Sequence, residues 1–138
     1  MLARELMHPG VECIGEHESL QEAAERMRAL DVGCLPICGH DGKLHGMVTD
    51  RDIVVWCLAE GRDPTTMMAG ELATGAPVWV AADADDEQVI RLMSENRVKR
   101  LPVIEDGRLV GMISEVDVAR ELRDDQVAHV TEAIYAGR

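Results

Sequence analysis

The chain has 138 residues, enough for one compact unit or for two small lobes that share a core, since a lone piece of about 60 residues buries little surface. Its core is expected to be aliphatic, because 46% of the residues are hydrophobic but there is no Phe, one Tyr and two Trp. A formal net charge of -12 repels polyanions, so we exclude nucleic acid and anionic membranes as main partners. The sequence contains no apolar run long enough to predict a signal peptide or a membrane span, so the expected location is the cytoplasm.

The first half of the chain predicts a strand at 11–14, a helix, a hairpin and a second helix. Apolar residues at helical spacing mark the first helix, and Ser19 with Glu22 predicts its start: Leu20, Ala23, Ala24, Met27 and Leu30. Strands at 34–38 and 44–49 flank a turn at 40–43, and a helix follows at 50–61. Residues 61–70 indicate a linker.

The second half predicts the same elements in the same order. A strand at 77–81 precedes a helix marked by Val89, Ile90 and Met93, with its start near Asp83. Strands at 100–104 and 108–114 flank a turn, and a helix follows at 115–124. Residues 125–138 predict a terminal helix that packs on the pair of repeats or on a second subunit.

The two halves are therefore copies of one unit. "DVGCLPICGHDGKLHGMVTDRDIV" (31–54) aligns with "RVKRLPVIEDGRLVGMISEVDVA" (97–119), which places Thr49 on Ser114 and Asp52 on Asp117. We expect an α/β (α+β) fold of two β-α-β-β-α repeats packed with pseudo-twofold symmetry, plus a C-terminal helix. The expected boundaries are repeat 1 at 1–60, a linker at 61–70, repeat 2 at 71–122 and a helical tail at 123–138.

The repeated phrase places a glycine in a strand, a hydroxyl residue at the strand end and an acid three residues later. The glycine would let a ligand approach the backbone, the hydroxyl and the helix start suit an anion such as phosphate, and the acid suits sugar hydroxyls. Taken alone, each instance is better interpreted as a helix cap. Its recurrence after a matching hairpin favours ligand binding.

The paired "LPI" and "LPV" strings, each followed by "DG", "GM" and the Thr or Ser phrase, resemble a tandem pair of cystathionine-beta-synthase (CBS) domains, a Bateman module. The resemblance covers residues 1 to about 122. "CIGEHE", "LHGMVTDRDIV" and "AGEL" further resemble a stand-alone member of this family from a mycobacterial hypoxic stress response. The resemblance implies a homodimer that senses an adenosyl small molecule such as AMP, ADP or ATP and signals to an unknown effector protein.

The resemblance also implies two ligand clefts and the role of each residue in them. The acid holds ribose hydroxyls, the hydroxyl residue lies beside phosphate, and the Met two places earlier flanks the base. Cleft A would be lined by Val11, Val32, Lys99, Arg100, Met112, Ser114 and Asp117. Cleft B would be lined by Val78, Val98, Met47, Thr49, Arg51 and Asp52.

Charge distinguishes the two clefts. Lys99 and Arg100 resemble phosphate-contacting positions, and charge-assisted hydrogen bonds are the stronger ones, so cleft A should favour a phosphorylated ligand. Alternatively, both are ordinary residues of a solvated strand edge. Asp50 and Glu115 would repel phosphate unless they point away, and Trp79 either stacks on a base or, as we favour, fills the core.

No catalytic motif is present, since the sequence lacks a P-loop, G-x-S-x-G and H-E-x-x-H, so we expect no enzyme. All four cysteines and four of the five histidines fall in or just before the first copy. The absence of a recognised ligand spacing disfavours zinc, and Cys13 and Cys38 are expected to remain thiols, with a disulfide within or between subunits as the alternative. The competing functional hypothesis is a ligand-free stress-response dimer controlled by cysteine redox state or zinc.

Overall fold

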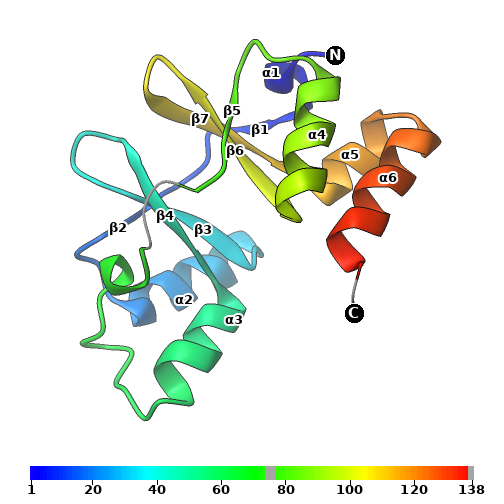
Figure 1. Ribbon diagram of the computed structural model, residues 1–138. Helices are drawn as coiled ribbons and strands as arrows, with labels where there is room; N and C mark the ends of the chain where they lie inside the picture. Colours follow the sequence, from blue (N-terminus) through cyan, green and yellow to red (C-terminus); the bar gives the residue numbers. More distant parts are fainter. Residues whose placement is uncertain (74–76, 137–138) are drawn as a thin grey trace. The chain divides into compact units, whose positions relative to one another are not determined.

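The computed structural model describes residues 1–73 and 77–136 (Figure 1). It divides into two compact units. The first-repeat unit spans Glu12–Pro77, and the second-repeat unit combines Met1–Val11 with Val78–Arg138. Both units mix helices with a sheet, which confirms the predicted α/β class.

The first-repeat unit carries a three-stranded sheet in the order β2-β3-β4. Its elements are β2 (Ile14–Gly15), α2 (Leu20–Leu30), β3 (Cys34–Cys38), β4 (Leu44–Thr49), α3 (Asp50–Ile53), a π-helical stretch (Val54–Leu58) and a 3-10 helix (Ala69–Leu72). The hairpin strands lie where the sequence predicts them. The strand expected at 11–14 begins only at Ile14, where parallel pairing with β3 starts. The expected linker ends in the 3-10 helix.

The second-repeat unit carries a four-stranded sheet in the order β1-β7-β6-β5. Its elements are α1 (Ala3–Leu6), β1 (His8–Pro9), β5 (Val80–Ala81), α4 (Asp86–Asn96), β6 (Arg100–Glu105), β7 (Arg108–Ser114), α5 (Glu115–Glu121) and α6 (Asp124–Tyr135). The sequence predicts neither α1 nor β1. Because β1 pairs antiparallel with β7, the start of the chain completes the sheet of the second repeat.

The helix starts follow the expected capping chemistry. Ser19 and Glu22 form a reciprocal capping box at α2. At α4 the cap is Asp85, whose side chain accepts the backbone N–H of Gln88, so the helix starts later than Asp83 suggests. These caps fix where each helix leaves its strand and therefore where the repeated phrase lies.

Each unit has its own cluster of buried aliphatic side chains, centred on Ile37 and Val48 in one and on Val103 and Ile113 in the other. The predicted terminal helix is present as α6, with Val130 and Ile134 buried in the core of the second-repeat unit; Gly137 and Arg138 lie outside the described residues. The favoured burial of Trp79 is wrong, since this residue is 45% exposed. In the described ranges no helix is both long and apolar enough to cross a bilayer.

Candidate functional site

The phrase in the first repeat forms the junction between β4 and α3. Thr49 caps α3: its backbone N–H donates to Asp52 Oδ2 (2.9 Å), and the Asp52 N–H donates to Thr49 Oγ1 (3.1 Å). Met47 lies two residues earlier on the same face of β4, half-buried like Thr49. The hydroxyl and acid expected to act together are thus in contact.

The phrase in the second repeat forms the same junction between β7 and α5. The Ser114 backbone N–H donates to Asp117 Oδ2 at 2.8 Å, and the Ser114 hydroxyl donates to the same oxygen at 3.0 Å. Asp117 is only 1% exposed, and Arg120 Nη2 donates to its other oxygen at 2.8 Å. His8 Nε2 stands 3.9 Å from that oxygen. The two junctions therefore share their capping geometry but differ in the basic side chains around the acid.

The glycine of each phrase is approached by the protein's own chain, which corrects the expected ligand approach at these points. A Cβ at Gly111 would meet the His8 carbonyl oxygen at 2.7 Å, and one at Gly46 would meet Ala73 Cα at 3.0 Å. Both distances are shorter than ordinary van der Waals contact. These glycines therefore allow close packing within each unit.

The two basic residues expected near phosphate occupy different surroundings. Arg100 pairs with Ser114 across β6 and β7 and is exposed. Lys99 accepts the Glu115 backbone N–H through its carbonyl (3.0 Å), and its Nζ lies 5.1 Å from the centre of the Tyr135 ring. A cation over an aromatic face is a favourable contact. Arg100 is thus the basic side chain beside Ser114, while Lys99 contacts α6.

The acids that follow each hydroxyl residue have partners within their own units. Asp50 accepts the backbone N–H of Arg51 at 2.9 Å, and Arg51 itself is exposed. Glu115 accepts a hydrogen bond from the Tyr135 hydroxyl at 3.1 Å. Asp50 and Glu115 are the first residues of α3 and α5, and each carboxylate thus accepts a hydrogen bond from the protein itself.

The valines expected to line the base are distributed over both units. Val32 belongs to the first-repeat unit and is 43% exposed. Val11, Val78 and Val98 belong to the second-repeat unit, where Val78 and Val98 pack against its core.

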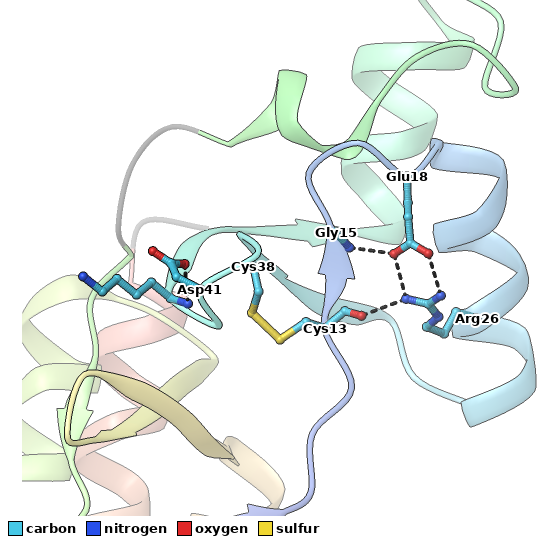
Figure 2. The surroundings of a disulfide bond; sticks show 7 residues. Cys13, Gly15, Glu18, Arg26, Cys38 and Asp41 are labelled. Atoms are coloured by element: carbon cyan, nitrogen blue, oxygen red, sulfur yellow. Dashed lines mark hydrogen bonds and ion pairs between the residues drawn. A yellow bond between two sulfur atoms is a disulfide. The ribbon is translucent and has the colours of Figure 1, made fainter.

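A disulfide joins Cys13, just before β2, to Cys38 at the end of β3 (Figure 2). Their Cα atoms lie 5.7 Å apart, a usual separation for a disulfide. The structure thus contains the alternative, a disulfide within one chain, and not the free thiols that the sequence favoured for these two residues. Cys57 is a buried thiol whose Sγ lies 3.4 Å from the Arg62 carbonyl oxygen.

An ion pair beside the disulfide ties α2 to the segment around β2 (Figure 2). Arg26 donates to both carboxylate oxygens of Glu18 (3.2 and 3.0 Å) and to the Cys13 carbonyl (2.7 Å). Glu18 also accepts the Gly15 backbone N–H at 2.6 Å. The Arg26 hydrogen bond and then the Gly15 N–H lower the pKa of Glu18 below its ordinary value of 4.5.

We expect Arg26→Gln to destabilise the protein more at neutral pH than in acid, where only its pH-independent hydrogen bond to the Cys13 carbonyl is lost. Because the pKa of Glu18 is lowered on folding, its ionised form stabilises the fold above about pH 5, and this contribution is lost as the pH falls through the folded pKa. Urea unfolding of both proteins between pH 7 and 3 would measure the difference in free energy. Arg28→Gln, an exposed change on the same helix, should show no such trend. A constant difference at all pH values would contradict the prediction.

A cavity of about 300 Å³ lies beside the disulfide in the first-repeat unit. It is lined by Gly15, Glu16, His17, Glu18, Cys38, Gly39 and His40. The ring centres of His17 and His40 are 6.2 Å apart, and His45 Nδ1 lies 3.0 Å from Glu16 Oε2. No cluster of three or more metal-ligating side chains occurs in residues 1–73 and 77–136. The sequence shows that these histidines lie near the cysteines along the chain. It does not show that folding brings His17 and His40 into one cavity beside Cys38.

Comparison with protein families identifies the repeats. The CBS domain model matches residues 3–58 and 69–124. Hypoxic response protein 1 of Mycobacterium tuberculosis is 49% identical over 132 residues, which cover 96% of this chain and 92% of that protein. The chain belongs to the CBS-domain family and carries two copies of the domain. The expected similarity to the mycobacterial hypoxic response protein is also confirmed.

Two solved structures inform the site. A crystal structure of Hypoxic Response Protein I with two coordinated zinc ions shares 51% identity, with a TM-score of 0.82, and covers 89% of this chain and 100% of its own. The structure of CBSX2 in complex with AMP shares 26% identity, with a TM-score of 0.73, and covers 86% of this chain and 93% of its own. The zinc ions of the first structure overturn our expectation that zinc is disfavoured, because ligand spacing along the chain does not reveal a site assembled by folding.

Proposed function

We propose that the chain is a regulatory, non-catalytic CBS-pair protein that binds an adenosyl ligand and signals its presence to a partner protein. The observation that carries this proposal is the repeated junction, in which a hydroxyl residue and an acid are held together at a strand end in both units. The AMP complex of the related CBSX2 supports the choice of ligand class.

Different residues of each site would bind the ribose, the phosphate and the adenine of the ligand. The carboxylates of Asp52 and Asp117 suit vicinal ribose hydroxyls, which are hydrogen-bond donors. Thr49 and Ser114 offer hydroxyls near phosphate, and Arg100, exposed beside Ser114, would add a charge-assisted hydrogen bond. Met47 and Met112 would flank the adenine, since flexible thioethers pack well on aromatic rings.

Signalling would require that the ligand binds one conformation of the protein more tightly than another. A ligand shifts the population of two conformations only if it binds one better than the other, and a partner can then distinguish them. We expect the partner to be another protein or a second copy of this chain, because the sequence lacks the P-loop, G-x-S-x-G and H-E-x-x-H motifs.

Calorimetric titration with AMP, ADP and ATP tests this function. Asp52→Ala and Asp117→Ala should each weaken binding at their own site by about 10- to 100-fold, the effect of losing hydrogen bonds to a charged group. Glu22→Ala is the matched control, since it removes the acid of a similar capping box in α2. The absence of saturable binding in the wild type would refute the proposal.

A second candidate function is a zinc-linked dimer. It is favoured by the 6.2 Å between the ring centres of His17 and His40 and by the two zinc ions in the crystal structure of Hypoxic Response Protein I. Zinc takes four ligands at about 2.0–2.3 Å, so His17 and His40 supply at most half of a tetrahedral set. We propose that a second copy of the chain supplies the other half.

This candidate predicts that zinc dimerises the metal-free protein. Sedimentation after removal of metal with chelator, with zinc then restored, should show the dimer returning in the wild type but not in His40→Ala. His129→Ala, an exposed change on α6, is the control and should behave as wild type. A chelator-resistant dimer, or zinc-dependent association retained in His40→Ala, would exclude this site.

A further inference from the structure

The acids of the two repeats differ in their partners. Both oxygens of Asp117 accept hydrogen bonds, Oδ2 from Ser114 and Oδ1 from Arg120. Asp52 accepts from Thr49 through Oδ2 and is half-buried, and Val55 stands at the place that corresponds to Arg120. In the second repeat, a cation of the protein therefore holds the oxygen that ribose would use.

The side chain that holds Asp117 is free to leave it. Arg120 lies three residues further along α5, its side chain is 54% exposed, and its Nε contacts Glu121 at 3.2 Å. His8 reaches the same oxygen only at 3.9 Å, with its side chain 75% exposed. Arg120 can thus rotate into solvent towards a surface carboxylate, whereas Asp117, buried at the helix start, stays in place.

Displacement of this cation costs free energy. A buried carboxylate is stable only when paired and hydrogen-bonded, and removal of its cation leaves a charge that neutral ribose hydroxyls compensate less well. A ligand at the second repeat must supply this difference, whereas Asp52 has no ion pair for a ligand to displace in residues 1–73 and 77–136.

We propose that Arg120 is a built-in competitor that occupies the ribose position of the second repeat, so that an adenosyl ligand binds first at Thr49 and Asp52. This inference rests on the proposed adenosyl function and reverses the order of affinity that Lys99 and Arg100 indicate. The second site then fills only at higher ligand concentration, which gives one small protein two thresholds for the same ligand.

AMP titration of an Asp52→Ala background isolates the second site. In this background Arg120→Gln should tighten AMP binding by about tenfold, because a site that is open only a tenth of the time loses that factor in apparent affinity. Arg120→Lys, which keeps the charge on a shorter side chain, should give a smaller gain and tests the idea if the Gln variant folds poorly. Arg123→Gln, at an exposed arginine paired with Asp125, is the control.

The outcomes separate this inference from the function on which it rests. Tighter binding in Arg120→Gln, with Arg123→Gln unchanged, supports the competitor. Unchanged or weaker binding in Arg120→Gln, with AMP still bound by the wild type, overturns the competitor and leaves the adenosyl function intact. Failure of the wild type and every variant to bind AMP overturns both.

Discussion

Reduction of the Cys13–Cys38 disulfide should lower the free energy of unfolding by about 3.5 kcal/mol, the loop-entropy estimate for a closed loop of this size. The two cysteines are 25 residues apart in sequence, so the bond restricts a long stretch of the unfolded chain. In the folded chain it fixes the segment before β2 to the end of β3, beside the carbonyl that Arg26 holds. The loss should therefore be concentrated in the first-repeat unit.

Urea unfolding with and without a phosphine reductant would measure this effect. The double variant Cys13→Ala/Cys38→Ala should match the reduced wild type and should not respond to reductant, which excludes effects on the other cysteines. Unchanged stability of the wild type on reduction would contradict the prediction. Cys38 lines the same cavity as His17 and His40. The same samples therefore also show whether zinc-dependent association depends on the redox state of the Cys13–Cys38 disulfide.

Gly111→Ala should destabilise the second-repeat unit by about 1–3 kcal/mol, the usual cost of forcing extra atoms into a packed site. The added methyl would overlap the Met7 side chain and lie 2.7 Å from the His8 carbonyl oxygen, which is backbone and cannot rotate away. The chain must respond by moving β1 off β7. His8, which lies near Asp117, would move with it.

Thermal unfolding and amide hydrogen exchange would reveal this displacement as lost protection along β1 and β7. Gly15→Ala is the matched control, because the atoms nearest to its added methyl belong to the Glu18 side chain and lie 3.4 Å or more away. Equal stability of the two variants, or full protection at His8 in Gly111→Ala, would contradict the close packing of β1 against β7.

The sequence predicted the elements that are determined by interactions between residues close together in the chain. Each hairpin follows from strand patterns that flank a turn, and the helix starts at Ser19, Thr49 and Ser114 follow from side-chain capping of exposed N–H groups. The internal repeat and the place of the hydroxyl and acid pairs were also readable, since alignment of the two copies needs no tertiary information. Each hairpin and helix start is determined by a short stretch of chain, and the repeat by comparison of two such stretches.

Only the tertiary structure decided the contacts between segments distant in sequence. The pairing of His8 and Pro9 with β7 was not predictable, because two residues carry no periodicity. The cavity with His17 and His40 arises because β2 pairs parallel to β3, which aligns the loops at their ends. Asp117 and Arg120 are close in sequence, but the burial of Asp117 depends on packing by distant segments. The sequence thus determined which groups are present, and folding determined which of them are already engaged, because burial and pairing are properties of packed segments and not of any single one.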